Sequence, residues 1–138
     1  MIVLDASVLA NVVGDDGVDG LVAREAIAAD DGVSIPDLAD VETVAVLRKR
    51  WLQGHLGDRR FAEAIEDLAA LPFDRYPTRP LMPRAYELRA NFTAYDAAYV
   101  ALAEALECEL VTADARLAAA PGATCPVRVI RRSERPAP

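Results

Sequence analysis

The chain has 138 residues, 53% of them hydrophobic and 27% charged, and its formal net charge at pH 7 is -7. This length suits a single domain with one sizeable core, and the composition excludes a solvated, disordered chain. The negative charge alone argues against a nucleic-acid partner, because phosphate binding draws on positive charge. All the cations except Lys49 are arginines, which suit bidentate phosphate contacts, but a GC-biased genome explains the same preference.

Nothing in the sequence indicates export or insertion into a membrane. The two cysteines, Cys108 and Cys125, have no CxxC or zinc spacing, and residues 1–5 lack the basic flank of a signal peptide. No apolar run approaches the roughly 20 residues that span a bilayer. We therefore expect a cytoplasmic protein without membrane contact.

The predicted elements alternate between short strands and helices. In chain order they are a strand over 2–5, helices over 7–13 and 19–29, a strand over 33–35, helices over 37–53 and 58–71, and a strand over 73–76. A proline-rich loop leads to helices over 84–90 and 96–106, a strand over 110–112, a short helix over 115–120, a strand over 127–130 and a polar tail over 131–138. This order predicts an α/β fold over residues 1–130, a three-layer α/β/α sandwich with a central, mostly parallel sheet.

Glu42 is the most informative acidic residue, because it lies on an apolar face of its predicted helix. Its neighbours three and four positions away are Leu38, Ala39, Ala45 and Val46. An unpaired buried carboxylate is costly, so this side chain should be neutralised, paired with a cation or bound to a metal. A buried arginine, such as Arg24 or Arg50, and a metal site both meet this requirement.

Three aspartates stand where helices begin, and each has an ordinary structural explanation. Thr93 and Asp96 match a capping box, while Asp5 and Asp114 are placed to cap the helices that follow them. Asp5 and Asp114 also come at or just after the ends of predicted strands. The carboxyl ends of parallel strands open onto one edge of a sheet, where ligands usually bind, and independent caps have no need to converge there.

If the four acids do converge, their charges raise one another's pKa values unless a divalent cation supplies the missing positive charge. A site made only of carboxylate oxygens selects Mg²⁺ or Mn²⁺ over zinc. The pattern therefore predicts a metal site formed by Asp5, Glu42, Asp96 and Asp114.

Four short segments together resemble the motifs of the PIN domain. They are Asp5-Ala6-Ser7 after the first strand, Glu42 in the helix after Pro36, Tyr95-Asp96-Ala97-Ala98-Tyr99, and Thr112-Ala113-Asp114. More closely, residues 1–130 resemble the toxin component of VapBC-type bacterial toxin–antitoxin pairs. The resemblance implies that Asp5, Glu42, Asp96 and Asp114 are the catalytic, metal-binding acids and that Ser7 and Thr112 support them. The region 54–92 carries no motif.

The resemblance further implies a divalent-metal-dependent endoribonuclease, a cognate antitoxin and a homodimer. Hydrolysis by water leaves a 5′-phosphate and a 3′-hydroxyl, unlike the cyclic phosphate of histidine-based ribonucleases. The only histidine, His55, follows a helix in a predicted turn, and we expect it to be an ordinary surface residue.

Other functional classes fit less well. A haloacid-dehalogenase-like phosphatase needs a second aspartate two residues after Asp5, where this chain has Ser7. A receiver domain needs an acidic pair, a phosphorylated aspartate and a late lysine, and none is evident. The better alternative is a non-catalytic metal- or RNA-binding module on the same PIN-like fold.

Overall fold

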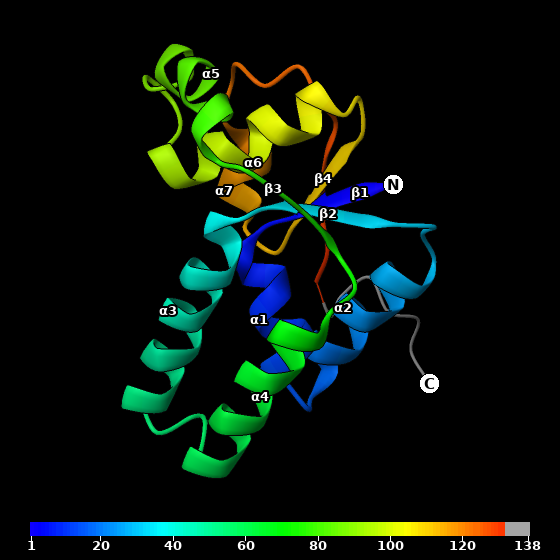
Figure 1. Cartoon of the computed structure of the whole chain (residues 1–138), viewed down its shortest axis with the longest axis vertical. Coiled ribbons are helices and arrows are strands. Elements are labelled where there is room, and N and C mark those ends of the chain that lie inside the picture. Colours follow the sequence, from blue (N-terminus) through cyan, green and yellow to red (C-terminus); the bar gives the residue numbers. More distant parts are fainter. Residues whose placement is uncertain (132–138) are drawn as a thin grey trace.

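A central parallel sheet organises the computed structural model, which describes residues 1–131 (Figure 1). Its strands are β1 (Ile2–Leu4), β2 (Val33–Pro36), β3 (Asp74–Tyr76), β4 (Glu109–Thr112) and β5 (Val127–Val129), in the spatial order β3-β2-β1-β4-β5. All pairs of neighbouring strands in this sheet are parallel. The first strand therefore lies in the middle, and its carboxyl end opens onto the same edge as that of β4.

Helices cover both faces of the sheet. They are α1 (Ala6–Gly14), α2 (Val18–Ala28), α3 (Leu38–Leu52), α4 (Asp58–Ala70), α5 (Met82–Glu87), α6 (Ala94–Ala105) and α7 (Ala115–Ala119). Helix α6 packs on β1, β2 and β4, with α5 and α7 on the same side of the sheet (Figure 1). Helices α1 and α2 lie on the other side, and α3 and α4 pack against α1. The three-layer α/β/α sandwich predicted from the sequence is confirmed.

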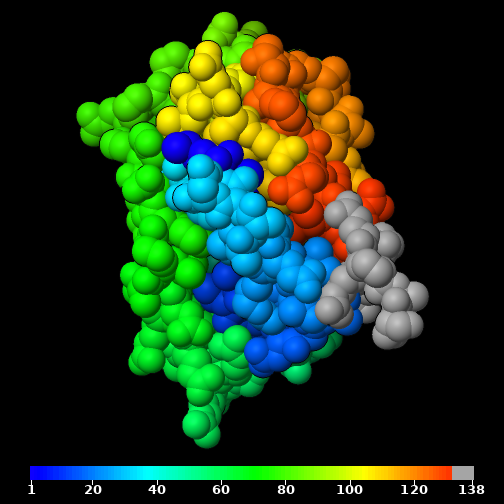
Figure 2. Space-filling model, turned by 90° about the vertical axis from the view of Figure 1, so that its right-hand side faces the viewer, coloured from blue at the N-terminus to red at the C-terminus, as the bar shows by residue number. Residues whose placement is uncertain are grey.

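The middle strand and α6 are the most enclosed elements. Ile2, Val3 and Leu4 are at most 2% exposed, and every residue of α6 from Ala97 to Ala103 is buried. Little of the N-terminal segment, drawn in dark blue, reaches the surface in Figure 2. Burial of apolar surface on this scale is the main stabilising term of the fold. Side chains at the ends of β1 and α6 therefore project from a rigid base.

The proline-rich segment after β3 is more ordered than its composition suggests. A single 3₁₀ turn covers Arg79–Leu81, and α5 begins at Met82 and ends at Glu87, not at 84 and 90 as predicted. Pro80 and Pro83 stand in the first turns of these helices, where a missing N–H is tolerated.

Two other predictions concern the polar tail and membrane-spanning helices. Apart from Arg131, the predicted polar tail lies outside the described residues. No helix within residues 1–131 is long and apolar enough to cross a membrane.

Candidate active site

Asp5 lies where β1 ends and α1 begins, and it is only 5% exposed. Its Oδ1 accepts hydrogen bonds from Ser7 Oγ at 2.6 Å and from the backbone N of Val8 at 3.2 Å, so the residue caps α1. Thr112 Oγ1 donates a hydrogen bond to its Oδ2. Burial raises the pKa of Asp5 above its ordinary value; these hydrogen bonds oppose the rise, and the charge of Asp96 adds to it.

The hydroxyls of Ser7 and Thr112 also connect Asp5 to the segment after β4. Ser7 Oγ accepts a hydrogen bond from the backbone N of Ala113 at 3.1 Å, and Thr112 Oγ1 accepts one from the backbone N of Asp114 at 3.0 Å. Each hydroxyl thus donates to the Asp5 carboxylate and accepts from a backbone N–H just after β4. The pairing of β1 with β4 brings these residues together across more than one hundred positions of sequence.

Glu42 extends from α3 to α6, where it meets Tyr99. The Tyr99 hydroxyl donates a hydrogen bond to Glu42 Oε1 at 2.8 Å, and the tyrosine itself is fully buried. Burial, and then the charge of Glu42, raises the pKa of Tyr99 above its ordinary value, so the phenol stays protonated and remains a donor. Burial also raises the pKa of Glu42; the Tyr99 hydrogen bond opposes this, and the charges of Asp96 and Asp5 reinforce it.

The suggested arginine partners of Glu42 are wrong. Arg50 Nη2 donates to Asn11 Oδ1 at 2.7 Å, and Arg24 Nη1 donates to two backbone carbonyls of the α1 end. Both guanidinium groups therefore contact other groups, although the buried Nη1 of Arg50 has no hydrogen-bond partner in the described part of the chain. The sequence motif contained Tyr99 but did not identify its role, because the contact depends on how α6 packs against α3.

Asp96 and Asp114 border a pocket of about 240 Å³ that is also lined by Asn91, Phe92, Thr93, Arg116, Leu117 and Ala120. Thr93 Oγ1 accepts from the backbone N of Asp96 at 3.1 Å and caps α6, while Asp114 Oδ1 accepts from the backbone N of Arg116 at 2.9 Å and caps α7. Burial raises the pKa of Asp96, and the charge of Asp114 adds to the rise. Asp114 therefore caps a helix and also borders the same pocket as Asp96.

The four acids thus form a chain of electrostatic neighbours along one edge of the sheet. The charge of Asp96 acts on Asp5 and Glu42, and that of Asp114 acts on Asp96. Within residues 1–131, no three acidic, histidine or cysteine side chains close into a tight cluster of metal ligands. Mg²⁺ keeps several waters and takes one or two carboxylates directly, so an open, all-oxygen group of acids fits this ion.

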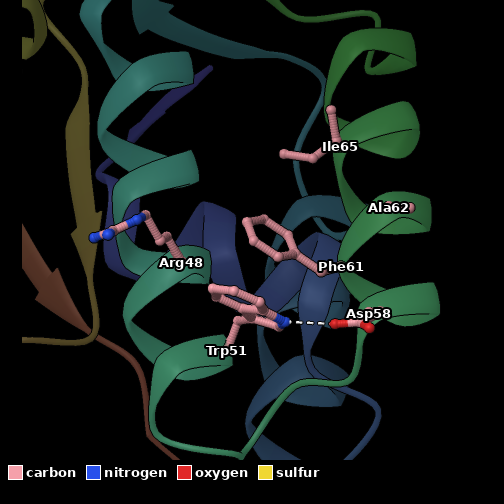
Figure 3. Close-up of a pocket in the computed structure, with 6 residues that line it drawn as sticks. All are labelled: Arg48, Trp51, Asp58, Phe61, Ala62 and Ile65. Carbon is pink, nitrogen blue, oxygen red and sulfur yellow. Dashed lines mark hydrogen bonds between the residues drawn. The ribbon is translucent and has the colours of Figure 1, made fainter.

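A second surface feature lies between α3 and α4, away from the acids. Arg48, Trp51, Asp58, Phe61, Ala62 and Ile65 line a mostly apolar groove of about 420 Å³. The rings of Trp51 and Phe61 face one another at 6.3 Å between centroids, and Trp51 Nε1 donates to Asp58 Oδ1 at 2.6 Å (Figure 3). Trp51 is 40% exposed. A large apolar side chain exposed within an apolar groove is a feature of interaction surfaces.

The sequence and the fold match a known family. The family model described as the PIN domain matches residues 2–123. The chain belongs to the PIN-domain family. The Mycobacterium tuberculosis protein named Ribonuclease VapC9 is 43% identical over 132 residues, which are 96% of this chain and 100% of that protein. Ribonuclease VapC1 of the same species is 36% identical over 130 residues, 94% of this chain and 97% of its own.

Solved structures of the PIN-domain family confirm the fold. VapC20 of Mycobacterium tuberculosis, described as a sarcin-ricin loop cleaving toxin, superposes with a TM-score of 0.67 at 17% identity, covering 86% of this chain and 94% of its own. VapBC2 from Rickettsia felis, solved with a DNA fragment from its promoter, gives a TM-score of 0.65 at 14% identity, covering 95% of this chain and 100% of its own. The resemblance recognised in the sequence motifs is confirmed at the level of the family.

Proposed function

We propose that this PIN-domain chain is a divalent-metal-dependent endoribonuclease that acts as the toxin of a toxin–antitoxin pair. The observation that carries the proposal is a series of four carboxylates, Asp5, Glu42, Asp96 and Asp114, in which the charge of each interacts with that of at least one other. The ribonuclease names of relatives that align over nearly the whole chain support the same activity.

The acids of the site are the groups that would hold the metal. They offer only oxygen ligands, which favours Mg²⁺ or Mn²⁺. A bound divalent cation would supply the charge that activates water for attack and offsets the negative charge of the phosphate. This answers the objection raised by the net charge of -7, because the acidic site binds RNA together with its cation.

The surrounding side chains keep the acids in place. Ser7 and Thr112 donate to the two oxygens of Asp5, and Tyr99 donates to Glu42. Hydrogen bonds of this kind favour the ionised carboxylate, which is the form that binds a cation. With water as the attacking group, the products carry a 5′-phosphate and a 3′-hydroxyl.

The test is hydrolysis of candidate RNAs by the purified protein with Mg²⁺, with Mn²⁺ and with chelator. Asp5→Asn and Asp96→Asn should abolish cleavage without unfolding the protein, because asparagine can replace Asp5 as the cap of α1 and the cap of α6 is Thr93 rather than Asp96. Arg59→Ala, on an exposed part of α4, is a matched control that should cleave like the parent. Activity that survives both chelation and the two aspartate substitutions would overturn the proposal.

The same experiment distinguishes the alternative, a non-catalytic metal- or RNA-binding module. Such a module binds RNA in a metal-dependent way and leaves it intact at every metal concentration. Product ends provide a further check, since a contaminating histidine-based ribonuclease leaves a cyclic phosphate and is unaffected by Asp96→Asn.

The partner that we propose is a cognate antitoxin, and the solved neighbours include a toxin–antitoxin complex from Klebsiella pneumoniae. We assign its docking surface to the apolar groove between α3 and α4, where the exposed Trp51 ring and the partly buried Phe61 ring would receive an apolar helix face (Figure 3). We also propose that the chain forms a homodimer, to be measured by light scattering with and without the antitoxin.

A further inference from the structure

Arg116 brings a positive charge into the pocket bordered by Asp96 and Asp114. It is the one cationic residue among the side chains that line this pocket. Its Nε lies 3.4 Å from Asp114 Oδ1, and its charge acts on Asp96. The guanidinium group of Arg116 therefore lies in the lining of the pocket that Asp96 and Asp114 border.

The guanidinium of Arg116 is less constrained than those of Arg75 and Arg84. Arg75 donates to both oxygens of Asp40 and to backbone carbonyls, and Arg84 donates to both oxygens of Glu104. Arg116 makes a single long ion pair through Nε, and its side chain is 92% exposed. Neither of its Nη atoms donates a hydrogen bond to a residue within the described part of the chain.

An exposed pair of this length contributes little to folding, so stability does not account for a cation at this position. A planar guanidinium with free Nη atoms is the side chain best suited to grip a phosphate through two parallel hydrogen bonds. The carboxylates of Asp96 and Asp114 repel the phosphates of an RNA strand. The positive charge of Arg116 at the rim of their pocket offsets that repulsion.

We propose that Arg116 is a substrate-binding residue that contacts a phosphate of the RNA strand at the rim of the acidic pocket. The inference rests on the proposed ribonuclease function and adds a specific contact to it. On approach of the strand, the Nη atoms take the phosphate while Nε keeps Asp114 beside it. Arg116 thereby places the strand against the acids and takes no part in bond breaking.

The test measures binding separately from cleavage. Full-length protein carrying Asp5→Asn, which removes cleavage, is titrated with a fluorescein-labelled pool of random single-stranded RNA in Mg²⁺ over a series of salt concentrations. Adding Arg116→Ala should weaken binding about tenfold, as expected for loss of a charge-assisted contact. The slope of log affinity against log salt should fall by about 0.7, the value for one phosphate contact on a single strand.

Two further variants make the result specific. Arg116→Lys should keep the salt slope and recover only part of the affinity, because an ammonium cannot form the bidentate contact. Arg59→Ala is the matched control: Arg59 has a 94% exposed side chain and also makes one ion pair, but it lies on α4, which packs on α1 and α3. A Mn²⁺ titration should show that Arg116→Ala binds metal no more weakly than its parent, since it removes a positive charge.

Each outcome decides the inference. Equal affinity and equal salt slope for Arg116→Ala and Arg59→Ala overturn it, even where the wild-type protein cleaves RNA. Loss of affinity and slope at Arg116 alone supports it, even where the wild-type protein leaves RNA intact and the nuclease proposal fails. Absence of RNA binding by both the Asp5→Asn parent and the wild-type protein overturns the inference and the proposed function together.

Discussion

Two fully buried threonines allow the hydrogen bonding of the site to be tested against a matched background. Thr112 and Thr43 are each 0% exposed. Thr112 Oγ1 donates to Asp5 and accepts from the backbone N of Asp114, whereas Thr43 Oγ1 has no partner. Replacing either residue by valine removes one hydroxyl and keeps the branched shape.

Only the first of the two substitutions should lower stability. A buried hydrogen bond to a charged group contributes about 1.5–3 kcal/mol, so Thr112→Val should lower the free energy of unfolding by roughly 2 kcal/mol or more. Thr43→Val removes a buried hydroxyl that gains nothing in return, so it should be neutral or stabilise by up to about 1 kcal/mol. The first change also withdraws a hydrogen bond that lowers the pKa of Asp5.

Urea unfolding at neutral pH, followed by circular dichroism, measures both free energies on the full chain. Mg²⁺ titration of the same samples should show weaker binding for Thr112→Val, by about tenfold or more, and unchanged binding for Thr43→Val. Equal loss of stability in the two variants, or a larger loss at Thr43, would show that valine is penalised for its shape and would refute the hydrogen-bond reasoning.

Three further predictions follow from the site and the groove. Tyr99→Phe removes the hydrogen bond to Glu42, so the pKa of Glu42 rises further and Mg²⁺ binding, followed by calorimetry, should be lost at a higher pH than in the wild type. Asp96→Asn should raise the thermal midpoint of the metal-free protein at neutral pH. A carboxyl whose pKa is raised in the folded state destabilises the fold once the pH exceeds that pKa. The difference in thermal midpoint between the variant and the wild type should therefore vanish below the ordinary aspartate pKa near 4. Trp51→Ala should weaken antitoxin binding in a pull-down and leave RNA cleavage unchanged, and the opposite pattern would remove the groove from the partner surface.

The sheet edge that carries the site was predictable because it depends on local patterns. Short apolar runs that end at Asp5 and near Asp114 indicate parallel strands, and parallel strands share one polarity. The apolar ring of residues after Asp96 indicates an enclosed helix. These two patterns together predict that three of the four acids lie near one edge of the sheet.

The partner of Glu42 could not be predicted in the same way. The apolar helix face showed that the carboxylate needed a partner, and arginine was the natural suggestion. The actual donor, Tyr99, is 57 positions away on a helix whose rotation about its own axis is set by packing on the sheet. Sequence spacing within one helix does not determine that rotation.

The middle position of β1 has a consequence for folding. Strand β1 needs β4 as a neighbour, and Thr112 meets Asp5 across 107 positions of sequence. The hydrogen bonds around Asp5 therefore form only when segments far apart in the sequence have paired, so local helix formation alone does not order this carboxylate.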